Sequence, residues 1–272
     1  MIRMKPLLAV GMALSWILFA GGASTQEEPQ LTVEQQAEFL LKARVTKNKT
    51  TSKGITLPQR LTMSDGQLTH DASFQSINER KMRFQGADGT VEMNFVDSYL
   101  YNLAAYELAK LLGISDMMPV TVPRSWGGRS GCFAWWLPVQ MDEAERLKKK
   151  LEPPDVEAWN RQMVVMRVFS ELVYDTDRNL GNVLIGKDWK LYMIDFTRAF
   201  RLYKDIKEPK NLTRCSRAVL EKLRTLDAAE LKERTKGLLN KPEVEGVMAR
   251  RDKIVAHFEK LVSQKGEAAV LF

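Results

Sequence analysis

The feature that most constrains the fold is a polar loop followed by a short hairpin, within residues 175–197. Asp177 and Asn182 lie five residues apart in the loop, and Asp195 comes thirteen residues after Asn182. Two short apolar runs separated by a turn at 186–188 predict the hairpin between them. Because a hairpin returns the chain to its starting point, we expect Asp195 to lie beside Asn182, with Asp177 close by.

This group of side chains suits phosphoryl transfer. Asp195 and Asn182 offer the oxygen ligands that Mg²⁺ prefers, and Mn²⁺ would suit the same ligands. Asp177 is placed to accept the proton of an attacking hydroxyl group. The sequence leaves an alternative open, in which Asp175 and Asp177 only cap the end of a helix in an unrelated structural protein.

The chain before this loop predicts a small lobe rich in strands with one main helix. A linker of polar residues is expected at 47–53, a hairpin or irregular insertion at 80–96, and a helix capped by Asp97 at 98–112. The remaining expected elements are an amphipathic helix at 31–45 and strands at 55–63, 67–77, 118–122 and 132–139.

The chain from residue 141 onward has the apolar spacing of helices. The helices are expected at 155–174, 216–226, 228–239 and 242–262. The predicted fold class is therefore α+β with two lobes and a hinge near 137–142. We expect the boundaries to be an N-terminal helix and linker at 25–53, an N-lobe at 54–140 and a helical C-lobe at 141–272.

Two motifs resemble those of the atypical kinases. The loop Asp-Arg-Asn-x-x-Asn-Val-Leu at 177–184, followed by Ile-Asp-Phe at 194–196, is similar to the loop of phosphatidylinositol 3- and 4-kinases, Golgi casein kinase-type secretory kinases and HipA-type bacterial kinases. The helix at 103–113, followed by Met118-Pro119-Val120, looks like a helix and strand of the secretory kinases. The resemblance covers about residues 54–200 and implies a protein-kinase-like fold that binds ATP with Mg²⁺ between its lobes.

The resemblance also shows where this chain departs from the family. Those kinases carry a Phe-Lys-Pro strand, and Phe74-Gln75-Ser76 puts Gln75 at the position of the lysine that contacts phosphate. Asn102 takes the place of its glutamate partner, which leaves a neutral pair, and Glu107 is a second candidate for that glutamate. Lys81 is a candidate replacement cation, and Arg60 in the first hairpin is a candidate to cover the phosphates.

Two functional hypotheses follow. The first is an exported kinase that moves the terminal phosphoryl group of a Mg-nucleotide to a hydroxyl acceptor that the sequence does not identify. The second is a pseudokinase, weak or inactive in catalysis, that binds and regulates a protein partner. Arg198 and Arg201 are either phosphate contacts or surface charges, and Trp135-Trp136 is either core and hinge or a contact for adenine.

Composition excludes several other classes. Two His and two Cys are too few for a multi-ligand zinc or iron–sulfur site. The net charge of +7 is spread along the chain without a basic stripe interleaved with aromatic residues, so no nucleic-acid partner is expected. Cys132 and Cys215 are expected to be two buried thiols or, alternatively, a disulfide.

Residues 1–24 predict a secretory signal peptide. Arg3 and Lys5 precede an apolar core at 7–20, and small residues follow at 21–24. We therefore expect an exported protein of bacterial type, periplasmic or secreted, with an uncleaved N-terminal anchor as the alternative. No second segment is apolar enough to predict further contact with a membrane.

Overall fold

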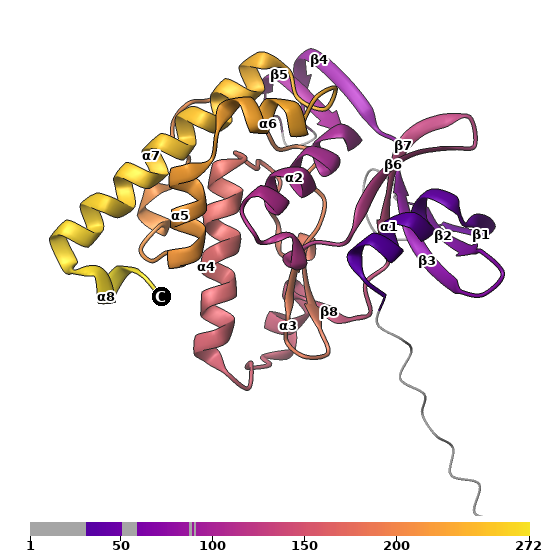
Figure 1. Cartoon of the computed structure of the whole chain (residues 1–272), viewed down its shortest axis with the longest axis horizontal. Coiled ribbons are helices and arrows are strands. Elements are labelled where there is room, and N and C mark those ends of the chain that lie inside the picture. The colour runs from indigo at the N-terminus through magenta and orange to yellow at the C-terminus, as the bar shows by residue number, and fades with distance from the viewer. Residues whose placement is uncertain (1–30, 51–58, 87–88, 90) are drawn as a thin grey trace, which may run out of the picture. The chain divides into compact units, whose positions relative to one another are not determined.

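Residues 31–50, 59–86, 89 and 91–272 are described by the computed structural model (Figure 1). The predicted signal peptide lies outside the described residues, and so do residues 51–53 of the predicted linker. The described part from residue 32 onward has a β-rich N-lobe and a helical C-lobe, which confirms the predicted α+β fold with two lobes. None of its helices combines the length and apolar character needed to cross a membrane.

A five-stranded antiparallel sheet forms the N-lobe, in the order β1-β2-β3-β7-β6. Its strands are β1 (Arg44–Thr50), β2 (Gln59–Ser64), β3 (Thr69–Gln75), β6 (Thr121–Trp126) and β7 (Arg129–Trp135). Alternate residues such as Leu61, Ala72 and Phe133 are fully buried, because side chains of a strand point alternately to its two faces. Helix α1 (Val33–Lys42) packs on β6 and β7. The predicted linker is therefore wrong over 47–50, where the polar residues of β1 pair with β2.

Helix α2 (Tyr99–Leu111) is the main helix of the N-lobe and packs against β6 and β7. It begins one residue later than predicted, because the Ser98 hydroxyl accepts a hydrogen bond from the Leu100 amide (3.3 Å) and Asp97 is not the cap. Eight of its thirteen residues are buried, so packing on both sides holds this helix.

A two-stranded ribbon of β4 (Asn78–Gln85) and β5 (Val91–Ser98) stands where the sequence predicts an irregular or hairpin insertion. An isolated hairpin is only marginally stable in water, so its contacts with the C-lobe matter. Arg80 pairs with the buried Glu243 of α7 (3.2 Å), and Glu92 pairs with Arg198 and Arg201 (2.6 and 2.7 Å). The ribbon thereby joins the two lobes, beside α7 in Figure 1.

The C-lobe combines a small antiparallel sheet with six α-helices in its described residues. The strands are β8 (Val139–Asp142), β9 (Val183–Gly186) and β10 (Leu191–Met193), and the helices are α3 (Glu143–Lys149), α4 (Val156–Leu172), α5 (Arg217–Thr225), α6 (Ala228–Arg234), α7 (Lys241–Lys265) and α8 (Glu267–Val270). Helix α4 begins at the cap Asp155, and α7 at Asn240 with a capping box to Glu243. The fully buried Arg250 of α7 donates to the carbonyl of Leu172 at the end of α4 (2.7 Å).

Both cysteines are free thiols buried in different lobes. This confirms the prediction of two buried thiols and excludes the disulfide between Cys132 and Cys215. Burial raises the pKa of each thiol to about 12, so both are uncharged and poor nucleophiles at neutral pH.

Candidate active site

The loop after α4 is held by a buried arginine. Arg178 forms an ion pair with Asp175 (2.6 Å), and the two side chains are only 10% and 0% exposed. The same guanidinium donates to the carbonyl of Asn182 (3.0 Å) and to that of Ile194 (2.6 Å). One side chain therefore joins the beginning of the hairpin to its end.

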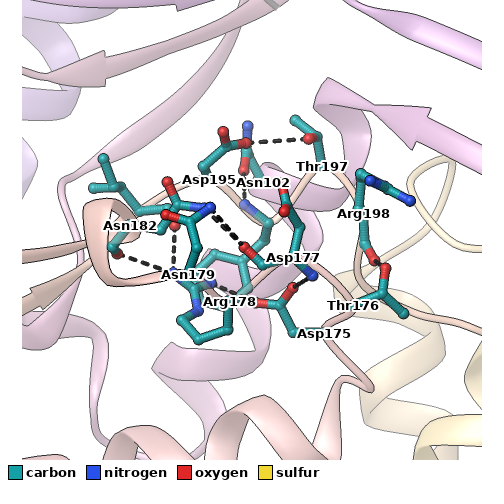
Figure 2. Close-up of polar contacts among 12 residues, drawn as sticks. Asn102, Asp175, Thr176, Asp177, Arg178, Asn179, Asn182, Asp195, Thr197 and Arg198 are labelled. Carbon is teal, nitrogen blue, oxygen red and sulfur yellow. Dashed lines mark hydrogen bonds and ion pairs between the residues drawn. The ribbon is translucent and has the colours of Figure 1, made fainter. Parts of the chain in front are cut away.

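Asn182 lies directly beside the end of the hairpin, as its spacing predicts. In the β9–β10 pair, Val183 faces Met193, and the Ile194 amide donates to the Asn182 carbonyl (3.1 Å). The side-chain Nδ2 of Asn182 donates to the backbone carbonyl of Asp177 (2.9 Å; Figure 2). No described residue donates to the side-chain oxygen Oδ1, which therefore remains available as a ligand.

Asp195 has a left-handed backbone conformation (φ +57°), which is uncommon for a residue other than glycine. Its Oδ1 accepts hydrogen bonds from the Thr197 hydroxyl (3.1 Å) and from Nε2 of Gln75 (3.5 Å). No hydrogen bond from the described residues reaches its second oxygen, Oδ2. Burial raises the pKa of Asp195, and the carboxylates of Asp97 and Asp177 raise it further.

Gln75 and Asn102 form the neutral pair that the sequence predicts. Asn102 Nδ2 donates to Gln75 Oε1 (2.5 Å), while Asn102 Oδ1 accepts from the backbone amide of Phe196 (2.6 Å). Gln75 in turn donates to Asp195. Two amide side chains thus connect β3 and α2 of the N-lobe to the segment that carries Asp195.

Asp177 projects from the loop near Asp195 (Figure 2). Its backbone carbonyl holds Asn182, but no described residue donates a hydrogen bond to its carboxylate. This leaves the carboxylate free to accept a proton from a bound molecule.

Asp97 is a site residue that the sequence did not identify, because an Asp before a helix is typical of a cap. Its Oδ1 is inaccessible to solvent and has no hydrogen-bond partner among the described residues. Burial raises its pKa, and the carboxylates of Glu79 and Asp177 add to the effect. No three His, Cys, Asp or Glu side chains in the described ranges are arranged to hold a metal ion, so the donor set would be Asp195 with Asn182.

The other predicted contacts lie apart from this group. Lys81 is half-exposed and pairs with Glu79 (2.6 Å) on the ribbon. Glu107, the second candidate for the family's glutamate, is paired with Lys110 on the same helix. Arg60 is bound to Asp71 (2.6 Å).

Arg198 and Arg201 are not free surface charges. Both are bound to Glu92 of the ribbon, and Arg201 also donates to the carbonyl of Val96 (2.9 Å). These two arginines therefore anchor the segment after Asp195 to the ribbon.

Comparison with known proteins finds the fold but no relative by sequence. No family model and no curated protein matches this chain. The structure of hydra Fam20 with sugar aligns over 88% of this chain and 92% of its own, with a TM-score of 0.65 and 13% identity.

Two further solved structures have a similar fold. The Golgi casein kinase with Mn/ADP bound covers 88% of this chain and 78% of its own, with a TM-score of 0.63 and 13% identity. The Helicobacter pylori proinflammatory kinase CtkA covers 83% of this chain and 98% of its own, with a TM-score of 0.51 and 10% identity. These likenesses confirm that the chain has an atypical kinase-like fold.

Proposed function

We propose that this protein is a phosphotransferase that moves the terminal phosphoryl group of a Mg-nucleotide to a hydroxyl group. The observation that carries the proposal is that the β9–β10 hairpin brings the segment of Asp195 back beside Asn182, whose Nδ2 donates to the Asp177 carbonyl. The Golgi casein kinase has the same fold and binds Mn/ADP, which supports a nucleotide and a divalent cation as ligands.

The donor atoms suit a hard divalent cation. Asp195 Oδ2 and Asn182 Oδ1 are oxygens, and no described residue donates to either atom. Asp195 also has a raised pKa, which a bound cation would lower. A Mg²⁺ ion held by these two residues would neutralise charge on the phosphates, with Mn²⁺ as an alternative.

Asp177 is proposed as the base. Its free carboxylate takes the proton of the acceptor hydroxyl while that oxygen forms a bond to the terminal phosphorus. The bond from that phosphorus to the bridging oxygen breaks, and the nucleoside diphosphate leaves with the electron pair. Arg178 takes no part in the transfer and instead positions the loop that carries Asp177.

Thermal unfolding of the purified chain with and without ATP and Mg²⁺ tests this function. Saturation at a hundredfold excess over the dissociation constant stabilises a protein by about 2.7 kcal/mol. We expect a shift that requires both ligands and is lost in Asp195→Ala. An unchanged shift in Asp195→Ala, or no shift in a folded wild-type protein, would contradict the proposal.

The pseudokinase alternative rests on a specific observation, the neutral pair of Gln75 and Asn102. Gln75 occupies the position of the lysine that contacts the nucleotide phosphates in the family. The described site therefore offers no cation in that position. The two functions differ in turnover. Release of phosphate or autophosphorylation that is lost in Asp177→Asn supports the enzyme, whereas nucleotide binding with no turnover under any acceptor supports the pseudokinase.

The acceptor and the location of the protein are further proposals. The hydra Fam20 structure contains a sugar, which supports including sugars among the hydroxyl compounds tested, beside proteins and lipids. The signal-like residues 1–24 support export to the periplasm or medium. Sequencing the N-terminus of the protein recovered outside the cytoplasm would detect cleavage after residues 21–24.

A further inference from the structure

One face of the N-lobe sheet is directed at the candidate active site. Asp71, Ser73 and Gln75 alternate along β3, so their side chains share a face. Gln75, at the end of this row, donates to Asp195 of the C-lobe. We call the face that carries this row the inner face. Asp71 is four residues from Gln75 and therefore lies about 13 Å further along it.

An arginine on the neighbouring strand is fixed on the inner face. Arg60 of β2 pairs across the sheet with Ser73 of β3. Its Nε binds Asp71 Oδ2 (2.6 Å), and Lys49 approaches the same carboxylate (3.7 Å). The Asp71 side chain is only 14% exposed. Its pKa is nevertheless lowered, because Thr62, Arg60 and Lys49 stabilise the ionised form against the effect of burial.

The guanidinium of Arg60 lies on an aromatic ring at the junction of the lobes. Its Cζ is 4.2 Å from the ring centroid of Trp136, whose amide donates to the Asp71 carbonyl (3.1 Å). The preceding Trp135 contacts Phe39 and His70 instead. Trp136 stands between β7 and β8, where the chain passes from the N-lobe to the C-lobe.

We propose that the guanidinium plane of Arg60, fixed by Asp71 and Trp136, is the platform on which the nucleobase of the nucleotide stacks. The inference rests on the proposed function and deepens it. A guanidinium is flat and stacks on aromatic rings, including bases. The Arg60 side chain is 38% exposed although Asp71 and Trp136 contact it, so part of its surface remains open to a ligand.

The charge environment of Arg60 favours contact with the base of the nucleotide rather than with its phosphates. Asp71 already neutralises the guanidinium, which lowers its value as a phosphate contact. The inner face also separates the two ends of the ligand, because Asp195 lies at the Gln75 end and Arg60 lies opposite Ser73, further along the row. This differs from the sequence-based expectation that Arg60 covers the phosphates.

Titration calorimetry with Mg-ATP, Mg-GTP and Mg-tripolyphosphate, which has no base, tests the assignment. Loss of a base-stacking contact costs roughly tenfold in affinity, as for aromatic platforms that bind single strands. Arg60→Ala should lose about this factor for both nucleotides and keep the affinity for tripolyphosphate. Arg60→Lys retains the charge beside Asp71 but not the plane, so it should lose nucleotide affinity in the same selective way.

Arg83→Ala is the matched control, since it removes an exposed arginine from the ribbon. Equal losses for nucleotides and tripolyphosphate in Arg60→Ala would mean that Arg60 contacts phosphate, and unchanged affinities would mean that it contacts neither. Either outcome overturns the inference, as does full nucleotide affinity in a folded Arg60→Lys. Wild-type protein that binds tripolyphosphate as tightly as ATP overturns the inference alone, whereas wild-type protein that binds none of the three overturns the proposed function as well.

Discussion

The two halves of the candidate active site are built differently. The C-lobe half depends on a buried ion pair, Arg178 with Asp175, whose guanidinium also holds two backbone carbonyls. The N-lobe half depends on two neutral amides, Gln75 and Asn102, which contact each other and the segment around Asp195. The charged pair of Arg60 and Asp71 lies further along the inner face of the N-lobe sheet.

The two halves of the candidate site therefore meet different requirements. In the proposed reaction the C-lobe half requires a rigid loop, because the roles proposed for Asp177 and Asn182 depend on their precise placement. The N-lobe half holds Asp195 without adding charge, so the negative charge of the site is left for a cation to balance. We order the following predictions by their expected effect on the free energy of unfolding.

Arg178→Ala should have the largest effect. It leaves the fully buried Asp175 carboxylate without its partner, and breaking a buried pair in this way costs about 3–5 kcal/mol. Denaturant unfolding measures the loss. Arg161→Ala is the control, because its pair with Glu157 is exposed and should contribute little. A cost no larger than that of the control would mean that charge does not hold the C-lobe half together.

Asn102→Ala should have the next largest effect. It removes the acceptor for the buried Phe196 amide, and an unsatisfied buried donor costs about 1–3 kcal/mol. Gln75→Ala should cost less, since Gln75 is closer to solvent and its bond to Asp195 is long (3.5 Å). Equal costs for the two variants, measured by the same unfolding curves, would indicate that the pair acts as one unit.

Asp97→Asn should stabilise the ligand-free protein at neutral pH. The raised pKa of Asp97 means that the folded state binds the proton more tightly than the unfolded state does. The stability of wild-type protein therefore falls as pH rises from the ordinary pKa of an Asp through the raised one. Asparagine removes this loss, so the melting temperature should rise by about 2–4 °C per kcal/mol recovered.

Melting curves at several pH values test whether the stability gain of Asp97→Asn depends on pH in this direction. The difference between Asp97→Asn and wild-type protein should vanish in acid, where Asp97 is protonated in both folded and unfolded chains. A difference that is independent of pH would assign the gain to packing rather than to charge.

Asp177→Asn should leave the free energy of unfolding nearly unchanged, because no described residue donates to its carboxylate. Turnover, measured as phosphate release, should fall by roughly 10²–10⁴-fold, the usual contribution of a general base. Nucleotide affinity should stay close to that of wild-type protein. A large loss of stability would show that Asp177 is structural, as the helix-capping alternative for this loop predicts.

Much of the candidate site could be predicted from sequence spacing, because its residues are close together in the chain. Asp177, Asn182 and Asp195 are joined by one tight hairpin, so their proximity depends on residues close together in the chain. The pairing of Gln75 with Asn102 was predicted from a family resemblance instead, since 27 residues separate the two. Asp97 was missed because two of the carboxylates that influence it, Asp177 and Asp195, come from a distant segment, and a strand end before a helix carries no sign of them.

The β4–β5 ribbon is the part of the fold whose long-range contacts could not be predicted from the sequence. Its strands were expected only as one possible form of an insertion, and nothing local indicated that Glu92 would bind two arginines more than a hundred residues later. Glu107 was misplaced for a related reason. It was a candidate partner for Gln75, whereas its side chain is 23% exposed and pairs with Lys110 and with Arg234 of α6.

Local patterns in the chain were enough to predict the two lobes, the hairpin and the three oxygen-bearing side chains around it, because periodicity and turn chemistry act over a few residues. Which charges hold the fold together and which remain for a ligand depended on tertiary packing. Arg60, Arg178, Arg198 and Arg201 are indistinguishable as charges along the chain. Their roles differ because long-range contacts surround each with different carboxylates and carbonyls, and the strength of a charged group depends on its burial and its partner.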